Sequence, residues 1–259
     1  MSFLERLFGG KDDENYADVA TMFGRAQVYD VMNDDRDFLR VLDIAGTWQS
    51  ASYVDERWAD LAFGYHRIFD QAFGAPVDIR RALMLGGGAL SYPKHVVART
   101  EAQVEVVEID PIVISLAQEW FFLDRLSAAQ RKRLSVTCSD ALVYLEKSKE
   151  AGRRYDLVVN DLFAAERPTA GFMSRKGLEL VRDVLTPGGI YVANVVSALT
   201  GRKARPLQLV EEALESVFLQ VEVVSLGADE PRTPDNNVVF ATCGDYSLAD
   251  VLSRGGLSG

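Results

Sequence analysis

LMLGGGALSYPKHV, residues 83–96, is an apolar run that stops on three glycines and resumes with an amphipathic pattern. It predicts a buried strand, a tight turn at Gly86, Gly87 and Gly88, and then a helix. Glycine permits unusual backbone angles and lets a ligand approach the main chain closely. In a doubly wound sheet, ligands bind beyond the carboxyl end of such a strand, where it turns into its helix. The alternative interpretation of the triplet is a purely structural turn.

The sequence after this turn continues to alternate apolar runs with helical patterns. Runs such as LVVN and YVANVV are apolar on both faces, as expected when helices cover a parallel sheet on each side. The prediction is therefore an α/β fold with a doubly wound, mostly parallel sheet of seven strands, in which the first five have the order 3-2-1-4-5. The expected strands are 81–85, 104–109, 134–138, 155–160, 190–195, 221–226 and 238–243. The expected helices begin near Tyr92, Pro111, Ala141, Arg175 and Pro206.

The region before the glycine strand has a different pattern. Residues 26–55 alternate short apolar segments with turn residues, which predicts hairpins, and residues 56–73 read as a helix. We therefore expect four parts: an N-terminal extension (1–25), a small β region with a linking helix (26–75), a nucleoside-binding α/β domain (76–245) and a C-terminal tail (246–259).

Composition narrows the classes of function. The 259 residues carry a net charge of −10 with a pI near 4.8, which opposes nucleic-acid binding because phosphate contacts need clustered Lys and Arg. No apolar run approaches the length of a membrane span, so the chain reads as soluble. Cys138 and Cys243 each stand alone in an apolar stretch, which predicts reduced core thiols and a cytoplasmic location. Two histidines without a Cys cluster argue against a metal site, and we expect His95 on the surface of the first crossover helix.

Acidic residues lie at the ends of three strands, at the predicted ligand edge of the sheet. Glu108 lies 22 positions beyond Gly86, where an acidic side chain accepts hydrogen bonds from ribose hydroxyls. Asp140 could cap the helix that follows it or accept a hydrogen bond from an adenine amino group. Asp161 follows the strand expected beside the glycine strand, which places a carboxylate near the reactive end of the nucleoside.

In these features the chain resembles the spermidine synthases, or polyamine aminopropyltransferases, which have the class I methyltransferase fold. The similarity extends from about residue 26 to 243 and includes the small N-terminal β region. The motifs that carry it are GTWQS (46–50), FGYH (63–66), LMLGGG (83–88), VEIDP (107–111), SDA (139–141), YDLVVND (155–161) and LTPGG (185–189).

The resemblance implies roles for individual residues. It predicts decarboxylated S-adenosylmethionine, or S-adenosylmethionine itself, as cosubstrate, a small amine as second substrate, and a homodimer or homotetramer. Asp161 matches the aspartate that accepts the proton of the amine, and Tyr65 and His66 match a pair on the amine side. The remaining matched positions, assigned to the cosubstrate, are Gln49, Gly86, Gly87, Gly88, Glu108, Asp110, Asp140, Ala141 and Pro168.

The chain departs from the family pattern on the amine side. Polyamine synthases typically have an aspartate at the position of Ala89, where it holds the aminopropyl ammonium. A second amine-binding carboxylate is replaced by Ala164, and the glutamate after the Tyr-His pair is Arg67. Burying an ammonium without a paired acceptor is costly, so putrescine is a doubtful substrate.

Three functions remain open on the sequence alone. The favoured one is aminopropyl transfer from decarboxylated S-adenosylmethionine to an amine, with Asp161 as proton acceptor. The first alternative is an S-adenosylmethionine-dependent methyltransferase on the same fold, and the second is a non-catalytic member that binds the nucleoside. An NAD-dependent dehydrogenase is less favoured, because the triplet does not supply the spaced G-x-G-x-x-G pattern.

Overall fold

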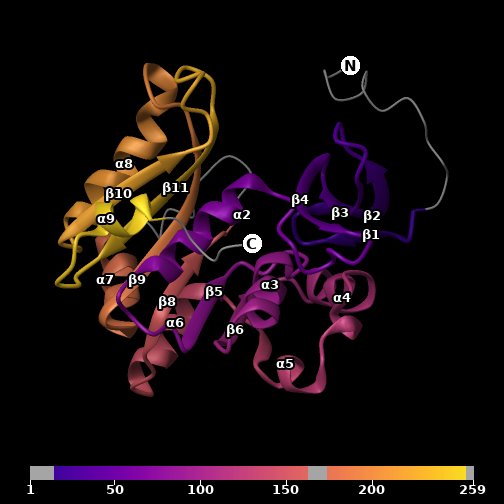
Figure 1. Ribbon diagram of the computed structural model, residues 1–259, viewed down its shortest axis with the longest axis horizontal. Coiled ribbons are helices and arrows are strands. Elements are labelled where there is room, and N and C mark those ends of the chain that lie inside the picture. The colour runs from indigo at the N-terminus through magenta and orange to yellow at the C-terminus, as the bar shows by residue number, and fades with distance from the viewer. Residues whose placement is uncertain (1–14, 163–173, 255–259) are drawn as a thin grey trace.

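The computed structural model, which describes residues 15–162 and 174–254, contains two separate sheets (Figure 1). The larger one has seven strands in the order β10-β11-β9-β8-β5-β6-β7, and all of them run parallel except β11. Its first five strands in the chain therefore have the predicted 3-2-1-4-5 order. Its strands are β5 (Arg81–Leu85), β6 (Gln103–Glu108), β7 (Leu134–Cys138), β8 (Tyr155–Asn160), β9 (Leu185–Ser197), β10 (Gln220–Ser225) and β11 (Asp235–Thr242).

The smaller sheet is an antiparallel meander near the N-terminus. It consists of β1 (Ala17–Thr21), β2 (Gly24–Met32), β3 (Phe38–Ile44) and β4 (Thr47–Tyr53). Its first strand lies ahead of residue 26, where we expected the β region to begin. The turn between β3 and β4 is at Ala45 and Gly46, as predicted, and both residues have positive φ angles.

Helices pack on both faces of the large sheet, as the apolar strands predict. The buried residues accordingly form two large clusters, one on each face. The helices of four or more residues are α2 (Gly64–Phe69), η1 (Asp70–Gly74, a 3₁₀ helix), α3 (Ser91–Arg99), α4 (Pro111–Trp120), α5 (Ala128–Lys132), α6 (Ala141–Glu150), α7 (Arg175–Val184), α8 (Arg205–Glu215) and α9 (Leu248–Ser253). The last of these lies in the segment that we expected to be a tail.

The expected helix over residues 56–73 is wrong in its first half. Residues 56–60 form turns, and Phe63 is extended at φ −85° and ψ 134°, so that the α-helix begins only at Gly64. The guanidinium of Arg57 accounts for the turn, because it binds the carboxylates of Asp37 and Asp55 and lies 4.3 Å from the ring centroid of Tyr53. These tertiary contacts outweigh the helical pattern of the sequence.

Two expectations about buried and exposed side chains are also wrong. His95 is buried rather than on the surface; its Nδ1 lies 2.9 Å from the carbonyl oxygen of Ala59 and its Nε2 lies 3.0 Å from the carboxylate of Asp70. Cys138 and Cys243 are exposed rather than core thiols. Cys138 ends β7, the outermost strand on its side of the sheet, where many residues remain exposed.

The two sheets are joined by a continuous apolar contact. A cluster of buried side chains combines β2 and β3 with α4, and it also contains Ala89 from the turn after β5. Polar contacts reinforce it, since Ser50 Oγ of β4 accepts a hydrogen bond from the N–H of Ala89 at 2.9 Å. The N-terminal sheet therefore lies directly against the glycine turn.

Candidate active site

The glycine turn is compressed between the large sheet and β4. Gly86 has φ +86°, and a Cβ atom there would lie 2.5 Å from the carbonyl oxygen of Asp161. Gly88 has φ +48°, and its Cβ would lie 2.6 Å from Ser50 Oγ. A side chain at either position would push against the backbone after β8 or the side chain of β4. Part of the reason for the glycines is therefore packing within the protein.

The carboxylate of Glu108 closes this turn from the end of β6. Its Oε2 accepts from the N–H groups of Gly87 at 2.9 Å and Gly88 at 3.3 Å, and its Oε1 accepts from those of Ile109 and Asp110. The side chain is buried. The acid thus lies against the glycines, where the sequence predicts it, and it holds their backbone in place. Its contact with ribose remains a prediction.

The other residues assigned to the cosubstrate have different surroundings. Asp110 is fully buried; its Oδ1 caps α4 through the N–H of Ile112, and its Oδ2 accepts from the N–H of Met22 in the β1–β2 turn at 2.6 Å. Asp140 caps α6 through the N–H of Val143. Gln49 lies on β4 next to Ser50 and donates to the carbonyl of Thr47 at 3.5 Å.

Two predicted positions remain. Ala141, next to Asp140, is the buried first residue of α6. Pro168, like Ala164 of the amine side, lies outside the described residues.

Asp161 gathers the predicted amine-side residues around its carboxylate. Its Oδ2 accepts from Tyr65 Oη at 3.1 Å and lies 3.2 Å from His66 Nε2. Both side chains project from α2, which places them beside the carboxyl end of β8. The structure therefore joins residues that are 95 and 96 positions apart in the chain.

The hydroxyl of Tyr65 stays protonated in this arrangement. Burial, and after it the charge of Asp161, raise the pKa of the hydroxyl well above its usual value. Tyr65 therefore acts as a fixed donor to the carboxylate. The rings of Phe63 and Phe69 pack against it, with centroids 5.8 and 5.5 Å away.

Sequence reasoning missed Asn194 at this site. It lies on β9, and its Nδ2 donates to Asp161 Oδ1 at 3.3 Å, on the opposite oxygen from Tyr65 and His66. The side-chain oxygen of Asn194 is buried and has no hydrogen-bond partner among the described residues. The available signal was a lone amide near the carboxyl end of an otherwise apolar strand, YVANVV.

Ala89 lies outside any polar site. It is fully buried in the apolar cluster between the two sheets, although its backbone N–H is held by Ser50. The position that carries an acid in polyamine synthases is therefore part of the core in this chain.

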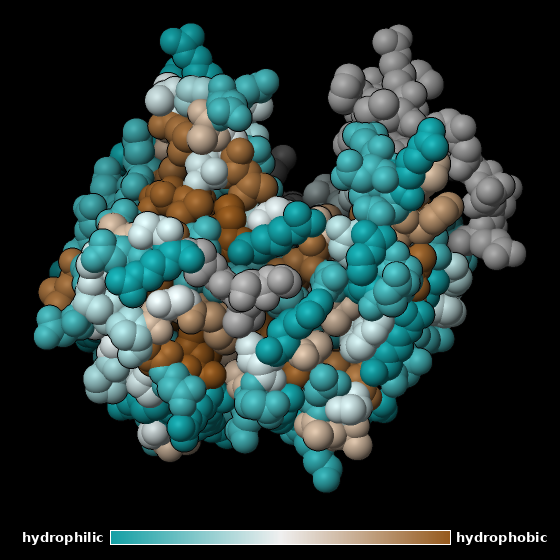
Figure 2. All heavy atoms as spheres, viewed as in Figure 1, coloured by the Kyte–Doolittle hydropathy of each residue, from teal (hydrophilic) through white to brown (hydrophobic). Residues whose placement is uncertain are grey.

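The surface of the molecule is hollowed between its two lobes. Figure 2 shows a broad notch between the N-terminal sheet and the region of β10 and β11. Apolar side chains gather over α2 and β11 on one wall of this notch (Figure 2). Asp161 is held by Tyr65 and His66 of α2, and the glycine turn by Ser50 of β4, so the site lies between α2 and β4.

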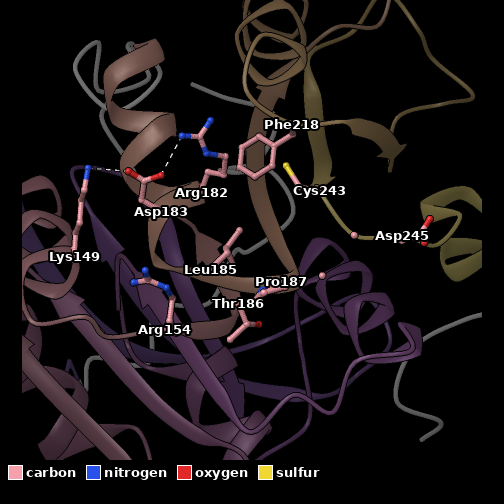
Figure 3. A pocket seen from close by; sticks show the side chains of 13 residues that line it. Lys149, Arg154, Arg182, Asp183, Leu185, Thr186, Pro187, Phe218, Cys243 and Asp245 are labelled. Atoms are coloured by element: carbon pink, nitrogen blue, oxygen red, sulfur yellow. Dashed lines mark hydrogen bonds and ion pairs between the residues drawn. The ribbon is translucent and has the colours of Figure 1, made fainter.

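A separate cavity of about 820 Å³ lies at the opposite edge of the large sheet (Figure 3). It includes Thr186 near the start of β9 and Cys243 just after the end of β11. Two of its cations, Lys149 and Arg182, pair with Asp183 (Figure 3). Since it lies away from the carboxyl ends of β5, β6 and β8, none of the predicted site residues contributes to it.

Metal binding and membrane spanning can both be checked on the described residues. Within residues 15–162 and 174–254, no group of three His, Cys, Asp or Glu side chains is arranged to hold a metal ion. No helix in that part of the chain is both long and apolar enough to cross a bilayer.

Comparison with proteins of known sequence finds two groups of relatives. The polyamine aminopropyltransferase of Vibrio vulnificus (strain CMCP6) is 27% identical over 150 residues, which are 58% of this chain and 48% of the relative. The eEF1A lysine and N-terminal methyltransferase of Xenopus laevis is 29% identical over 143 residues, 52% of this chain and 20% of the relative. The chain thus spans less than half the length of either relative.

Solved structures share the fold. A probable spermidine synthase from Corynebacterium glutamicum ATCC 13032 has a TM-score of 0.74 at 21% identity and covers 92% of this chain and 85% of its own. Human methyltransferase-like protein 13, in complex with SAH, has a TM-score of 0.56 at 22% identity and covers 74% and 87%. Residues 63–251 match the spermine/spermidine synthase domain, and the chain belongs to that family.

Proposed function

We propose that this protein transfers an aminopropyl group from decarboxylated S-adenosylmethionine to an amine, with Asp161 as the proton acceptor. The observation that carries this proposal is the position of Asp161. Its carboxylate lies between Tyr65, His66 and Asn194, and its backbone carbonyl packs against Gly86 of the glycine turn. A protonated alkylamine is not a nucleophile, and its pKa is about 10.4. A carboxylate at the reacting nitrogen can take the proton as the new bond forms.

Aminopropyl transfer needs no reactant other than the amine and the sulfonium donor. The amine nitrogen forms a bond to the carbon beside the sulfonium, the carbon–sulfur bond breaks, and sulfur keeps the electron pair as a neutral thioether. One proton passes from nitrogen to Asp161. The glycine turn, Glu108, Asp140 and Gln49 are the positions that we propose for the adenosine portion.

Methyl transfer from S-adenosylmethionine is the second candidate, and the surroundings of Ala89 favour it. A buried alanine offers no carboxylate to the ammonium of an aminopropyl donor, and none to repel the carboxylate of S-adenosylmethionine. The same Asp161 would then accept the proton of a methylated amine. The likeness to an eEF1A lysine and N-terminal methyltransferase is consistent with this alternative.

The two donors can be compared directly. Titration calorimetry with decarboxylated S-adenosylmethionine and S-adenosylmethionine, followed by mass spectrometry of the products formed from putrescine and butylamine, separates aminopropyl from methyl transfer. Asp161→Asn should lower the transfer rate by about 10²-fold or more while leaving donor affinity nearly unchanged, because a general base acts mainly in the transition state. An unaltered rate in this variant would remove Asp161 as the base.

A further inference from the structure

Three apolar side chains remain accessible around the carboxyl ends of β9 and β10. Val196 of β9 is 57% exposed, Leu226, which follows β10, is 39% exposed, and Phe63, which precedes α2, is half-buried. Single exposed apolar side chains are ordinary, but these three lie around one site. We call Val196, Leu226 and Phe63 the apolar ledge.

The ledge adjoins Asp161 along β9. Val196 lies two residues beyond Asn194, so both side chains project from the same face of the sheet, with their Cα atoms about 7 Å apart. Asn194 itself donates to the carboxylate of Asp161 at 3.3 Å. A molecule that binds Asp161 and extends along the carboxyl edge of the sheet therefore meets Val196 next.

The other two members of the ledge flank α2. A Cβ atom at Gly64, the first residue of α2, would lie 2.8 Å from Cδ2 of Leu226, so the two residues are in contact. The ring of Phe63 stacks on that of Tyr65 at 5.8 Å between centroids, and Tyr65 donates to Asp161. The ledge belongs to the wall of the notch where apolar side chains gather (Figure 2).

The elements that carry the ledge leave it without a second carboxylate. α2 has no acidic residue, and its charged side chain beside the site pair is the cation of Arg67. β9 has no charged residue. Asp235 of β11 pairs with Ser197, one position beyond Val196, and so faces the opposite side of the sheet. Within the described residues of α2, β9 and β11, therefore, no carboxylate shares the face of the ledge.

The acids closest to Leu226 in the chain lie in the connection between β10 and β11. Asp229 and Glu230 follow Leu226 by three and four residues and are exposed. An ion pair formed there with a bound ammonium is screened by water and contributes little. These acids therefore do not offset the loss of hydration of an ammonium placed on the ledge.

We propose that the acceptor is a primary monoamine with an apolar chain, whose nitrogen binds Asp161 and whose chain lies along the ledge. This inference rests on the proposed amine alkyl transfer and names the class of its second substrate. Full burial of a methylene group contributes about fourfold to binding, and a ledge that covers one side of the chain contributes about twofold. A diamine of the same length places an ammonium against Val196 and Leu226, where it loses water without gaining a paired acceptor.

The first test uses the full-length protein with whichever donor supports transfer. It compares kcat/KM for methylamine, butylamine and hexylamine with the values for diamines of four, six and eight carbons. The monoamines should improve by about twofold for each added methylene, and hexylamine should exceed 1,6-diaminohexane by about tenfold or more. Equal or better values for the diamines would overturn the inference, and a preference confined to the eight-carbon diamine would show that its far ammonium reaches Asp229 or Glu230.

A substitution on the ledge should change the class of amine that the protein uses. Val196→Asp places a carboxylate where the proposal puts the alkyl chain, and the exposure of Val196 lets the fold accept it. The ratio of 1,6-diaminohexane to hexylamine should rise by about tenfold or more, because the far ammonium gains a partner. Leu219→Asp, at an exposed residue just before β10, adds the same charge elsewhere and should leave this ratio unchanged.

A second variant tests the ledge without adding charge. Leu226→Ser shortens the apolar side chain, so the ratio of hexylamine to methylamine should fall by about threefold or more. A fall in the rates of all amines by one common factor would mean that Leu226 only supports α2. Unchanged ratios in both Val196→Asp and Leu226→Ser would show that the alkyl chain lies elsewhere, and would overturn the inference.

The failures of the two proposals differ. If no amine, short or long, reacts with either donor, amine alkyl transfer itself is wrong. If transfer occurs and is lost in Asp161→Asn, but the diamines are preferred, only the class of acceptor is wrong.

Discussion

Gly86 links the glycine turn, which we propose as part of the cosubstrate site, to the proposed base through a single close approach. Gly86→Ala should lower the free energy of unfolding by more than the roughly 1–2 kcal/mol expected for a left-handed alanine, because the new Cβ would lie 2.5 Å from the carbonyl oxygen of Asp161. The displaced backbone carries the Asp161 carboxylate with it. A shift of about 1 Å can cost about 10²-fold in rate. Urea unfolding and steady-state transfer rates measure both effects.

Gly152→Ala is the matched control for that substitution. Gly152 also has a positive φ, +65°, but no atom of the described chain lies within 4 Å of the place that a Cβ would take. It should show the conformational cost alone and keep full activity. Equal losses of stability in the two variants would mean that the Gly86 turn has room to relax, and that the contact with Asp161 is not a constraint.

Glu108 is a second residue whose role in the free protein can be measured. Its carboxylate accepts four backbone N–H groups, whereas the amide of Glu108→Gln would have one oxygen and direct N–H donors at the others. We expect about 1–3 kcal/mol less stability without any ligand. Glu101→Gln, at a side chain that is 96% exposed, is the control. If Glu108→Gln lost affinity for the aminopropyl or methyl donor but kept the stability of the wild type, this structural role would be contradicted.

The sequence predicted those site residues that belong to recognisable motifs. Glu108, Asp161 and the glycines follow strands at fixed spacings, so that the fold alone brings them to one edge. Asn194 and Lys94 were not predicted: Asn194 lies in a strand that otherwise reads as ordinary core, and Lys94 lies in a helix whose amphipathic pattern gives a lysine an ordinary place on the exposed face. Their importance depends on which neighbours are absent, and a sequence does not show that.

α3 carries the second of these residues, Lys94, in an unusual environment. The residue is 1% exposed, and its ammonium has no carboxylate partner among the described residues; it donates to Ser52 Oγ at 2.9 Å and to the carbonyl oxygen of Phe121 at 3.1 Å. Burial, and after it the charge of Arg125, lower the pKa of Lys94 to about 7. α3 therefore holds a titrating group at its contact with β4.

The stability of the protein should depend on pH through Lys94. Between about pH 7 and 10.5 the unfolded chain binds the extra proton and the folded one does not, so stability rises with pH across this window. Below pH 7 the full cost is present, at about 1.4 kcal/mol for each unit of pKa shift. Relative to the wild type, Lys94→Met should be most stable at pH 6 and lose that advantage towards pH 10.

Urea unfolding at several pH values measures this dependence, with the exposed Lys132→Met as control. The control should show no change with pH relative to the wild type. A constant difference between Lys94→Met and the wild type from pH 6 to 10 would mean that Lys94 keeps an ordinary pKa in the folded protein.

At the level of elements, the errors of prediction have one physical source. The amphipathic pattern of α3 predicted an exposed face with His95 on it, but the N-terminal region covers that face as well. The helical pattern of residues 56–63 gave way to the ion pairs of Arg57 with Asp55, two residues before it, and with Asp37 between β2 and β3. Both errors come from contacts of the N-terminal region, within itself around Arg57 and with α3 at His95, and local periodicity does not contain such contacts.

At the level of the whole molecule, the predicted sheet order follows from strand patterning and the rules of doubly wound folds, and the structure has it. The docking of the two sheets could not be predicted in the same way. It depends on the shared apolar cluster, on the bond from the N–H of Met22 to Asp110 and on the bond from Arg40 to the carbonyl oxygen of Trp120. None of these contacts has a sequence signature.

This docking predicts that the two sheets unfold together. Leu42 of β3 is fully buried in the shared cluster, so Leu42→Ala should cost about 2–5 kcal/mol. Tryptophan fluorescence follows Trp48 of β4, Trp58 in the segment after β4 and Trp120, whose ring centroid lies 5.3 Å from that of Tyr16 just before β1. Circular dichroism at 222 nm follows the helices, which in the described chain all begin at or after Gly64.

Leu42→Ala should shift both urea transitions by the same amount, whereas Leu219→Ala, at a side chain 79% exposed, should shift neither. Two separate transitions, with only the fluorescence one moved by Leu42→Ala, would show that the N-terminal sheet folds independently. In that case the hydrogen bond from Ser50 could not hold the glycine turn, because the N-terminal sheet that carries Ser50 would unfold before the large sheet does.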